Sequence, residues 1–117
     1  MLANILIALI GLLHVYILVL EMFLWDKPAG LKAFGNSPEK AQLTKVLAQN
    51  QGLYNGFLAA GLFWSLCAPE NYALPLVNFF LGCVLVAGIF GGLTASKKII
   101  YIQALPALVA LIVVNLF

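Results

Sequence analysis

Two ionisable side chains stand inside a long apolar run near the beginning of the chain. They are His14, the only histidine, and Glu21, and no charged residue lies between them. An ionisable group inside hydrocarbon is costly, so its presence there is by default the hypothesis of a functional site. Imidazole and carboxyl groups both exchange protons, which makes acid–base chemistry or proton transfer the first chemistry to consider.

Helix geometry limits how these two residues can cooperate. A separation of seven residues puts both on nearly the same helix face, but about 10 Å apart along the axis. That distance argues against a direct hydrogen bond and against one shared metal ion, so a water, a side chain or a ligand has to bridge them. Cys67 and Cys83 are expected on different helices and at different depths. Such a set lacks the ligand density of a structural zinc site, and we expect neither a metal nor another cofactor.

The composition indicates a membrane protein. Of the 117 residues, 64% are hydrophobic and 9% are charged, and the mean hydropathy is +1.08. A soluble domain carries about 25% charged residues, so this chain has too few to cover a surface in contact with water. The net charge of +2 and the absence of arginine argue against nucleic acid as a partner. The expected partner of most of the surface is the lipid bilayer.

The hydrophobic pattern predicts an all-α polytopic membrane protein, a single domain (residues 1–117) folded as an antiparallel bundle of four transmembrane helices. About 20 residues are needed to cross the roughly 30 Å hydrocarbon core. Runs of that length are expected at residues 2–25, 46–67, 74–95 and 99–117, joined by a longer loop at 26–45 and by two short ones.

Local signals refine these boundaries. Ser37 as an N-cap, followed by Pro38 at a first helical position, predicts a helix that begins near Pro38 and continues into the second span. Pro75 is expected in the first turn of the third span. Pro106 is expected to kink the fourth span, because proline lacks the N–H of a regular helical hydrogen bond.

The lysines predict the orientation in the membrane. Four of the six lie between residues 26 and 45, and Lys97 and Lys98 form the other group. The N-terminus, the second loop and the C-terminus contain none. Under the positive-inside rule, loops 26–45 and 96–98 are cytoplasmic and both termini lie outside, as in a multi-pass protein of the cell membrane.

Several polar side chains are predicted at the depth of Glu21 when residues are counted inward from the cytoplasmic ends of the spans. Polar residues between 50 and 55 occupy two adjacent faces of the second span. The candidate ligand-binding or proton-coupling residues are therefore Glu21, His14, Asn50, Gln51, Tyr54, Asn55 and Gln103. Interhelical hydrogen bonding that only fixes helix packing is the simpler interpretation of the amides.

Small residues predict close helix packing. Gly52, Gly56 and Ala60 recur at four-residue spacing, a pattern that lets two helix backbones approach. The third span is also rich in glycine. Either surface could pack within the chain or join two copies in a homo-oligomer.

Two segments resemble the signatures of a known family. They are residues 14–25, with the sequence HVYILVLEMFLW, and residues 50–61, with the sequence NQGLYNGFLAAG. Both are similar to a bacterial family of four-helix membrane proteins, catalogued as domain-of-unknown-function family 1304, and the resemblance covers nearly the whole chain. It implies a small bacterial inner-membrane protein and draws attention to the polar residues of these two segments. It implies no activity.

Three functions stay open at this point. The protein could bind or transport a small polar or cationic ligand in a cytoplasm-facing cavity around Glu21, with His14 on a route for protons. It could be a membrane-embedded enzyme for a lipophilic substrate, with Glu21 and His14 as acid and base. It could be a structural or accessory protein. The first is favoured because a lone carboxyl among amides, in a medium of low dielectric constant, is suited to coupling a ligand to a proton.

Overall fold

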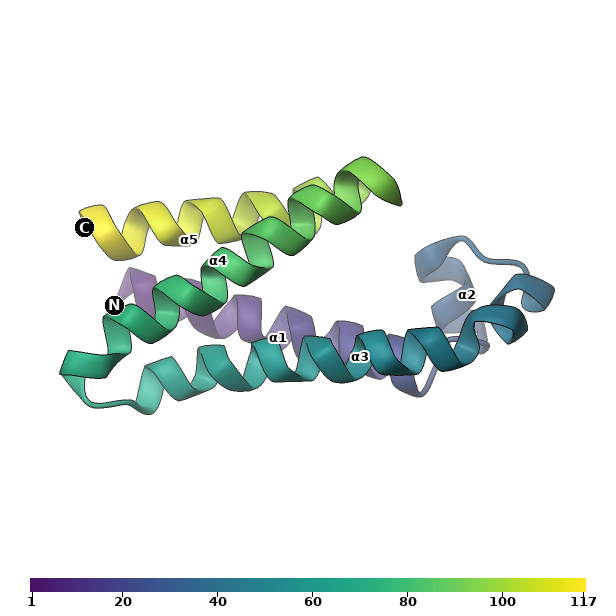
Figure 1. Ribbon diagram of the computed structural model, residues 1–117, viewed down its shortest axis with the longest axis horizontal. Coiled ribbons are helices and arrows are strands. Elements are labelled where there is room, and N and C mark those ends of the chain that lie inside the picture. Colours follow the sequence, from purple (N-terminus) through teal and green to yellow (C-terminus); the bar gives the residue numbers. More distant parts are fainter. The chain divides into compact units, whose positions relative to one another are not determined.

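The protein is entirely helical, which confirms the predicted all-α class. The computed structural model describes residues 1–117 and contains five α-helices, one π-helical segment and no strand. In chain order the elements are α1 (Leu2–Met22), α2 (Pro28–Phe34), α3 (Pro38–Cys67), α4 (Glu70–Thr94), η1 (Ile100–Ala104) and α5 (Leu105–Leu116) (Figure 1). Two of them, α1 and α4, are long and apolar enough to cross a membrane.

A short helix lies in the segment 26–45, which was predicted to be a loop up to the start of the next helix. α2 begins at Pro28, whose fixed φ suits a first helical position, and ends at Gly35 with a φ of 65°. Glycine adopts this left-handed conformation without steric cost. Gly30 lies against the Leu24 carbonyl, where a Cβ would collide. Seven residues are too few to reveal a helical period, so only this packing identifies the helix.

The beginning of α3 agrees with the prediction. The helix starts at Pro38, and the backbone N–H of Lys40 donates a hydrogen bond of 3.2 Å to Oγ of Ser37. This is the N-cap that the sequence predicts. α3 has 30 residues and therefore a length of roughly 45 Å.

α4 begins earlier than predicted. Its first residue is Glu70 rather than residue 74, and Pro75 lies inside the helix. The backbone N–H of Ala73 already donates to the carbonyl of Pro69 at 3.0 Å. Glu70 in the first turn is favourable because a negative charge interacts well with a helix N-terminus. One proline this close to the N-terminus removes a single hydrogen bond, so the helix continues past it.

The irregularity predicted at Pro106 lies directly in front of that residue. The segment η1 is π-helical, and the N–H of Leu105 donates to the carbonyl of Ile100, five residues earlier. Pro106 has no N–H to offer to the carbonyl of Ile102, so the regular pattern cannot pass through this turn. The wider π turn absorbs the defect before α5 resumes a regular helix.

The chain divides into two compact units. The first contains residues 1–11 and 60–117, and the second contains residues 12–59. α1 and α3 each contribute residues to both units. The units are described separately below.

In the first unit, α4 packs against η1 and α5 as an antiparallel hairpin (Figure 1). A Cβ at Gly88 would lie 2.5 Å from the backbone N of Ala104, so glycine lets the two backbones touch. Toward the other end of the hairpin, the amides of Asn78 and Asn115 exchange hydrogen bonds of 2.7 and 3.1 Å. These two pairings together fix the antiparallel register.

In the second unit, residues 12–22 of α1 and the first two-thirds of α3 are also antiparallel. The pairing of Glu21 with Asn55 lies at one level, and the pairing of Asp26 with Lys45 lies beyond the end of α1. α2 lies between these helices in the chain. This unit contains all but one of the predicted site residues.

We predict that Gly88→Ala lowers the stability of the first unit, with Gly82→Ala as the matched control in the same helix. At position 88 the new methyl meets backbone atoms of Ala104, and overpacking of this kind costs about 1–3 kcal/mol. At position 82 nothing lies within 4 Å, so alanine is favoured by about 1 kcal/mol of helix propensity. Thermal unfolding of the full chain in detergent measures both, and equal midpoints would contradict the close contact.

Candidate functional site

The carboxyl group of Glu21 is bound by an amide of α3. Nδ2 of Asn55 donates a hydrogen bond of 2.6 Å to Oε1 of Glu21, and the same nitrogen donates to the backbone carbonyl of Gln51 at 3.1 Å. Both side chains are half-buried. The second contact lies within α3 and orients the amide, so that Asn55 presents a fixed donor to the last turn of α1.

Glycine brings the two helices close enough for this bond. A Cβ at Gly52 would lie 2.5 Å from Cγ of Met22 and 3.1 Å from Cβ of Glu21. At Gly56, one turn later, a Cβ would lie 2.7 Å from Cδ1 of Leu18. The small residues at 52 and 56 therefore serve packing of α1 on α3 inside one chain. Ala60, the third member of the pattern, is exposed.

The side chains of the other polar residues predicted on α3 do not hydrogen-bond to Glu21. Nδ2 of Asn50 donates to the carbonyl of Val46 in its own helix at 2.9 Å. The side chains of Asn50, Gln51 and Tyr54 are all exposed, Tyr54 by 53%. Of the four candidates on this helix, Asn55 alone bonds to the carboxyl group.

His14 lies on α1 at another level than Glu21, and Gln103 belongs to the other unit. His14 is fully buried, with 0% of its surface exposed, and is two helical turns before Glu21 on α1. Gln103 belongs to η1 and is half-buried in the first unit. Within the second unit, Glu21 and Asn55 are thus two predicted site residues that a side-chain hydrogen bond joins.

Sequence reasoning missed a second amide pair, between Asn78 of α4 and Asn115 of α5. Its signal was present, because each asparagine is flanked on both sides by apolar residues within a predicted span. Asn115 also donates to the carbonyl of Leu111 at 2.8 Å. Each of the two side-chain amides donates a hydrogen bond to the other, and such a pair is suited to holding two helices together.

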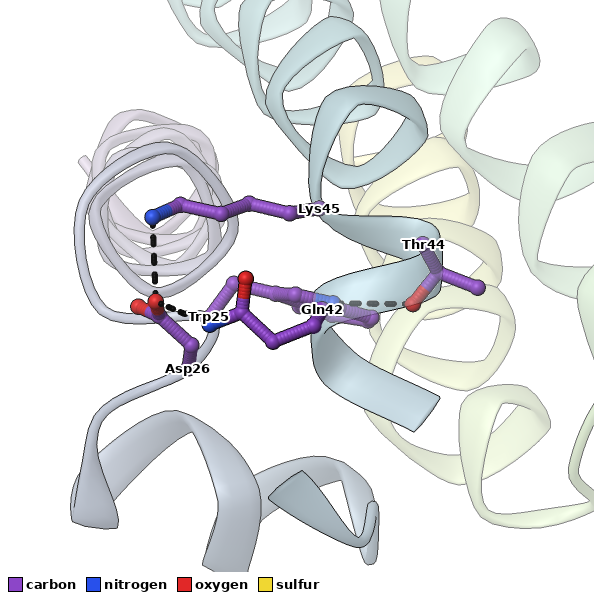
Figure 2. Close-up of polar contacts among 5 residues, drawn as sticks. All are labelled: Trp25, Asp26, Gln42, Thr44 and Lys45. Atoms are coloured by element: carbon purple, nitrogen blue, oxygen red, sulfur yellow. Dashed lines mark hydrogen bonds and ion pairs between the residues drawn. The ribbon is translucent and has the colours of Figure 1, made fainter. Parts of the chain in front are cut away.

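At the end of the second unit, polar contacts join five residues, which we call the polar cap. They are Trp25, Asp26, Gln42, Thr44 and Lys45. Figure 2 shows the side chains of Gln42 and Lys45 directed toward Asp26, and that of Trp25 directed toward Thr44. Gln42 Nε2 and Lys45 Nζ each donate to Asp26 Oδ2 at 3.0 Å. The indole N–H of Trp25 donates to Thr44 Oγ1 at 3.0 Å. These contacts connect the end of α1 to the first turns of α3.

Electrostatics keeps the acid of the polar cap ionised. The hydrogen bond from Lys45 holds the pKa of the Asp26 carboxyl below its ordinary value, and the charges of Lys45 and Lys27 act in the same direction. Partial removal from water opposes this shift of the pKa without reversing it. Asp26 and Lys45 therefore form an ion pair over the physiological pH range.

The fold and its polar groups define an all-helical protein with two helices of membrane-spanning length and apolarity, and with one carboxyl–amide pair between α1 and α3. Residues 8–115 match the model of the family described as protein of unknown function (DUF1304), and the chain belongs to this family. It is similar to the uncharacterized protein YpaA of Lactococcus lactis subsp. lactis (strain IL1403). The two are 32% identical over 106 residues, which cover 89% of this chain and 88% of that protein. No solved structure matches the chain.

We predict that the contribution of Asp26 to stability depends on pH. Because the pKa is lowered in the folded state, the contribution is present above the ordinary carboxyl pKa of about 4 and is lost as the pH falls through the folded value. Asp26→Asn should therefore unfold at a lower temperature than the unchanged protein at neutral pH, and the difference should shrink in acid. Thermal unfolding in detergent across this pH range measures it.

The same substitution in a Lys45→Gln background is the control. Without the lysine the pair is already broken, so Asp26→Asn should change the unfolding midpoint much less. A pH-independent difference, or full additivity of the two substitutions, would contradict the stabilising ion pair.

Proposed function

We propose that the protein is an integral membrane protein that crosses the bilayer four times. α1 and α4 supply two spans, residues 46–67 of α3 supply a third, and η1 with α5 supplies the fourth. Large apolar side chains are exposed along these helices, among them Leu9 (57%), Phe79 (65%) and Leu105 (50%). Such a surface is costly in water and favourable in lipid.

The lengths of the helices and the lysines support one orientation. α3 is longer than the roughly 30 Å hydrocarbon core, so its polar first turns extend beyond the membrane together with α2. Four lysines lie in this part, and Lys97 and Lys98 follow α4. We assign both regions to the cytoplasm and both termini to the outside, in a bacterial cell membrane.

Cysteine labelling tests this topology. In a chain with Cys67→Ser and Cys83→Ser, we expect Asn71→Cys to react with an impermeant maleimide in intact cells. Ser37→Cys should react only after the membrane is opened. Reaction of both in intact cells, or the reverse pattern, would contradict the orientation.

Within this frame, we propose that Glu21 binds a small cationic ligand and exchanges it for a proton. The observation that carries the proposal is the 2.6 Å hydrogen bond from Asn55 of α3 to a half-buried carboxyl near the end of the apolar helix α1. A lone carboxylate in such surroundings has no lysine within ion-pair distance, since the chain's one ion pair is Asp26–Lys45. A cation or a proton is therefore the partner that would neutralise it.

The remaining candidates take supporting roles in this proposal. Asn55 positions the carboxyl group. In the second unit Asn50, Gln51 and Tyr54 line the path of the ligand, and His14 lies on the route of the proton. The helix spacing between His14 and Glu21 gives no support to an acid–base pair of an enzyme.

A purely structural role is the second candidate, because the same hydrogen bond fixes the register of α1 on α3. Glu21→Gln separates the two functions. Glutamine keeps the shape and the oxygen that accepts from Asn55, but it carries no charge and releases no proton. The structural role predicts an unchanged protein, and the binding role predicts a stable protein without its activity.

We predict that the full chain in detergent binds the lipophilic cation tetraphenylphosphonium and that Glu21→Gln lowers the affinity at least about tenfold, the effect of losing about 1.4 kcal/mol. Calorimetry in two buffers of different ionisation enthalpy should show proton release for the unchanged protein only. Glu39→Gln, the same chemical change at an exposed acid of α3, should have little effect. Equal binding by the Glu21→Gln protein would leave the structural role.

A further inference from the structure

Three lysines of the second unit take no part in the polar cap. Lys27, Lys32 and Lys40 are exposed, and the chain's one ion pair is formed by Lys45. The ammonium group of an exposed lysine is a compact charge that binds phosphate well. These three residues are called the exposed lysines below.

Residues 26–45 have an excess of positive charge, because Lys45 and Gln42 of the polar cap already bind the carboxyl group of Asp26. Asp26 accepts from Lys45 and Gln42 through the same oxygen, Oδ2. Glu39 is the only other acid between residues 26 and 45. The exposed lysines therefore outnumber the unpaired acids by three to one, and the region carries net positive charge toward its surroundings.

Packing holds Lys32 near the end of α1. The rings of Trp25 and Phe34 lie with their centroids 4.7 Å apart, and Gly30 lies directly against the Leu24 carbonyl. α2, which carries Lys32, therefore packs against Leu24 and Trp25, which directly follow α1. Less entropy is lost on binding when charged groups are held in place beforehand.

The apolar surface of α3 begins next to these charges. Leu43 (86%), Val46 (69%) and Leu47 (67%) are exposed, whereas the turns before them are polar. Lys40 is six residues before Val46, which is about 9 Å along the helix. The headgroup layer on each side of the hydrocarbon is of similar thickness, roughly 5–8 Å, and a lysine side chain spans the remainder.

We propose that the exposed lysines form a binding surface for the phosphate headgroups of anionic phospholipids. The proposal rests on the membrane placement given above, and charge complementarity selects the occupant. The leaflet facing this end of α3 supplies phosphate groups at the depth of Lys40, and Lys27 and Lys32 lie in the segment that joins α1 to this end of α3. Anionic lipids gather around such a cluster, whereas zwitterionic lipids carry a compensating charge and are not enriched.

Tryptophan fluorescence tests this surface in the full chain. The protein contains two tryptophans, so Trp64→Phe leaves Trp25 as the single reporter in the polar cap. The protein is reconstituted into vesicles of phosphatidylcholine and phosphatidylglycerol in which one lipid at a time carries brominated acyl chains. Quenching then gives the relative binding constant of the two lipids beside Trp25. We expect phosphatidylglycerol to be favoured at low salt and the preference to fall as salt is raised.

Two double variants with equal loss of charge locate the effect. Lys32→Gln with Lys40→Gln should reduce the preference by about fivefold for each lysine removed, until no preference remains. Lys97→Gln with Lys98→Gln removes the same charge after α4 and should leave the preference at Trp25 nearly unchanged. A separate Trp25→Phe protein reports from Trp64, near the other end of α3, where we expect no preference.

The outcomes separate this inference from the proposal on which it rests. Equal quenching by both brominated lipids at Trp25, independent of salt, overturns headgroup binding and leaves an acidic protein as the occupant. An equal loss of the preference for phosphatidylglycerol in both double variants also overturns it. The lysines would then act through the total charge of the protein and not through their position. No quenching by either lipid overturns the membrane placement itself.

Discussion

The close contact of α1 and α3 at Gly52 is the constraint on which the second unit depends. With any side chain larger than hydrogen at this position, Met22 and Glu21 would have to move away from α3. The bond between Glu21 and Asn55 would then lengthen, and a half-buried carboxyl would lose its partner. Since such a group is costly to bury alone, the helix contact and the hydrogen bond stabilise each other. Backbone proximity comes first, because the amide can reach the carboxyl only across a narrow gap.

The same physical solution recurs in the first unit, where Gly88 lies on the backbone of Ala104 and Asn78 exchanges hydrogen bonds with Asn115. In both units a glycine sets the distance and an amide fixes the register. In the proposed membrane placement, these helices gain little from burying more apolar surface against each other, so dispersion contacts and hydrogen bonds have to hold them. The two amide sites differ in one respect, since only one of them contains an acid.

The two ends of the second unit divide the polar chemistry between them. The polar cap contains charges that satisfy each other outside the apolar part of α1, as Asp26 does with Lys45. Glu21 lies only five residues earlier and has an amide but no cation. The paired charge of Asp26 stabilises the contact between the end of α1 and the start of α3. Glu21 has no counter-ion and is available to a ligand or a proton. The contrast between these two acids is the physical basis of the proposed function.

The sequence by itself determined the helical class, the N-cap at Ser37 and the irregularity at Pro106, because these follow from local chemistry and from apolar run lengths. It could not select Asn55 among four polar neighbours on α3, nor place α2, nor pair Asn78 with Asn115. Those choices depend on which face of one helix meets which face of another. Tertiary packing decided them, since the distance between two backbones is set by glycines whose partners lie far away in the chain.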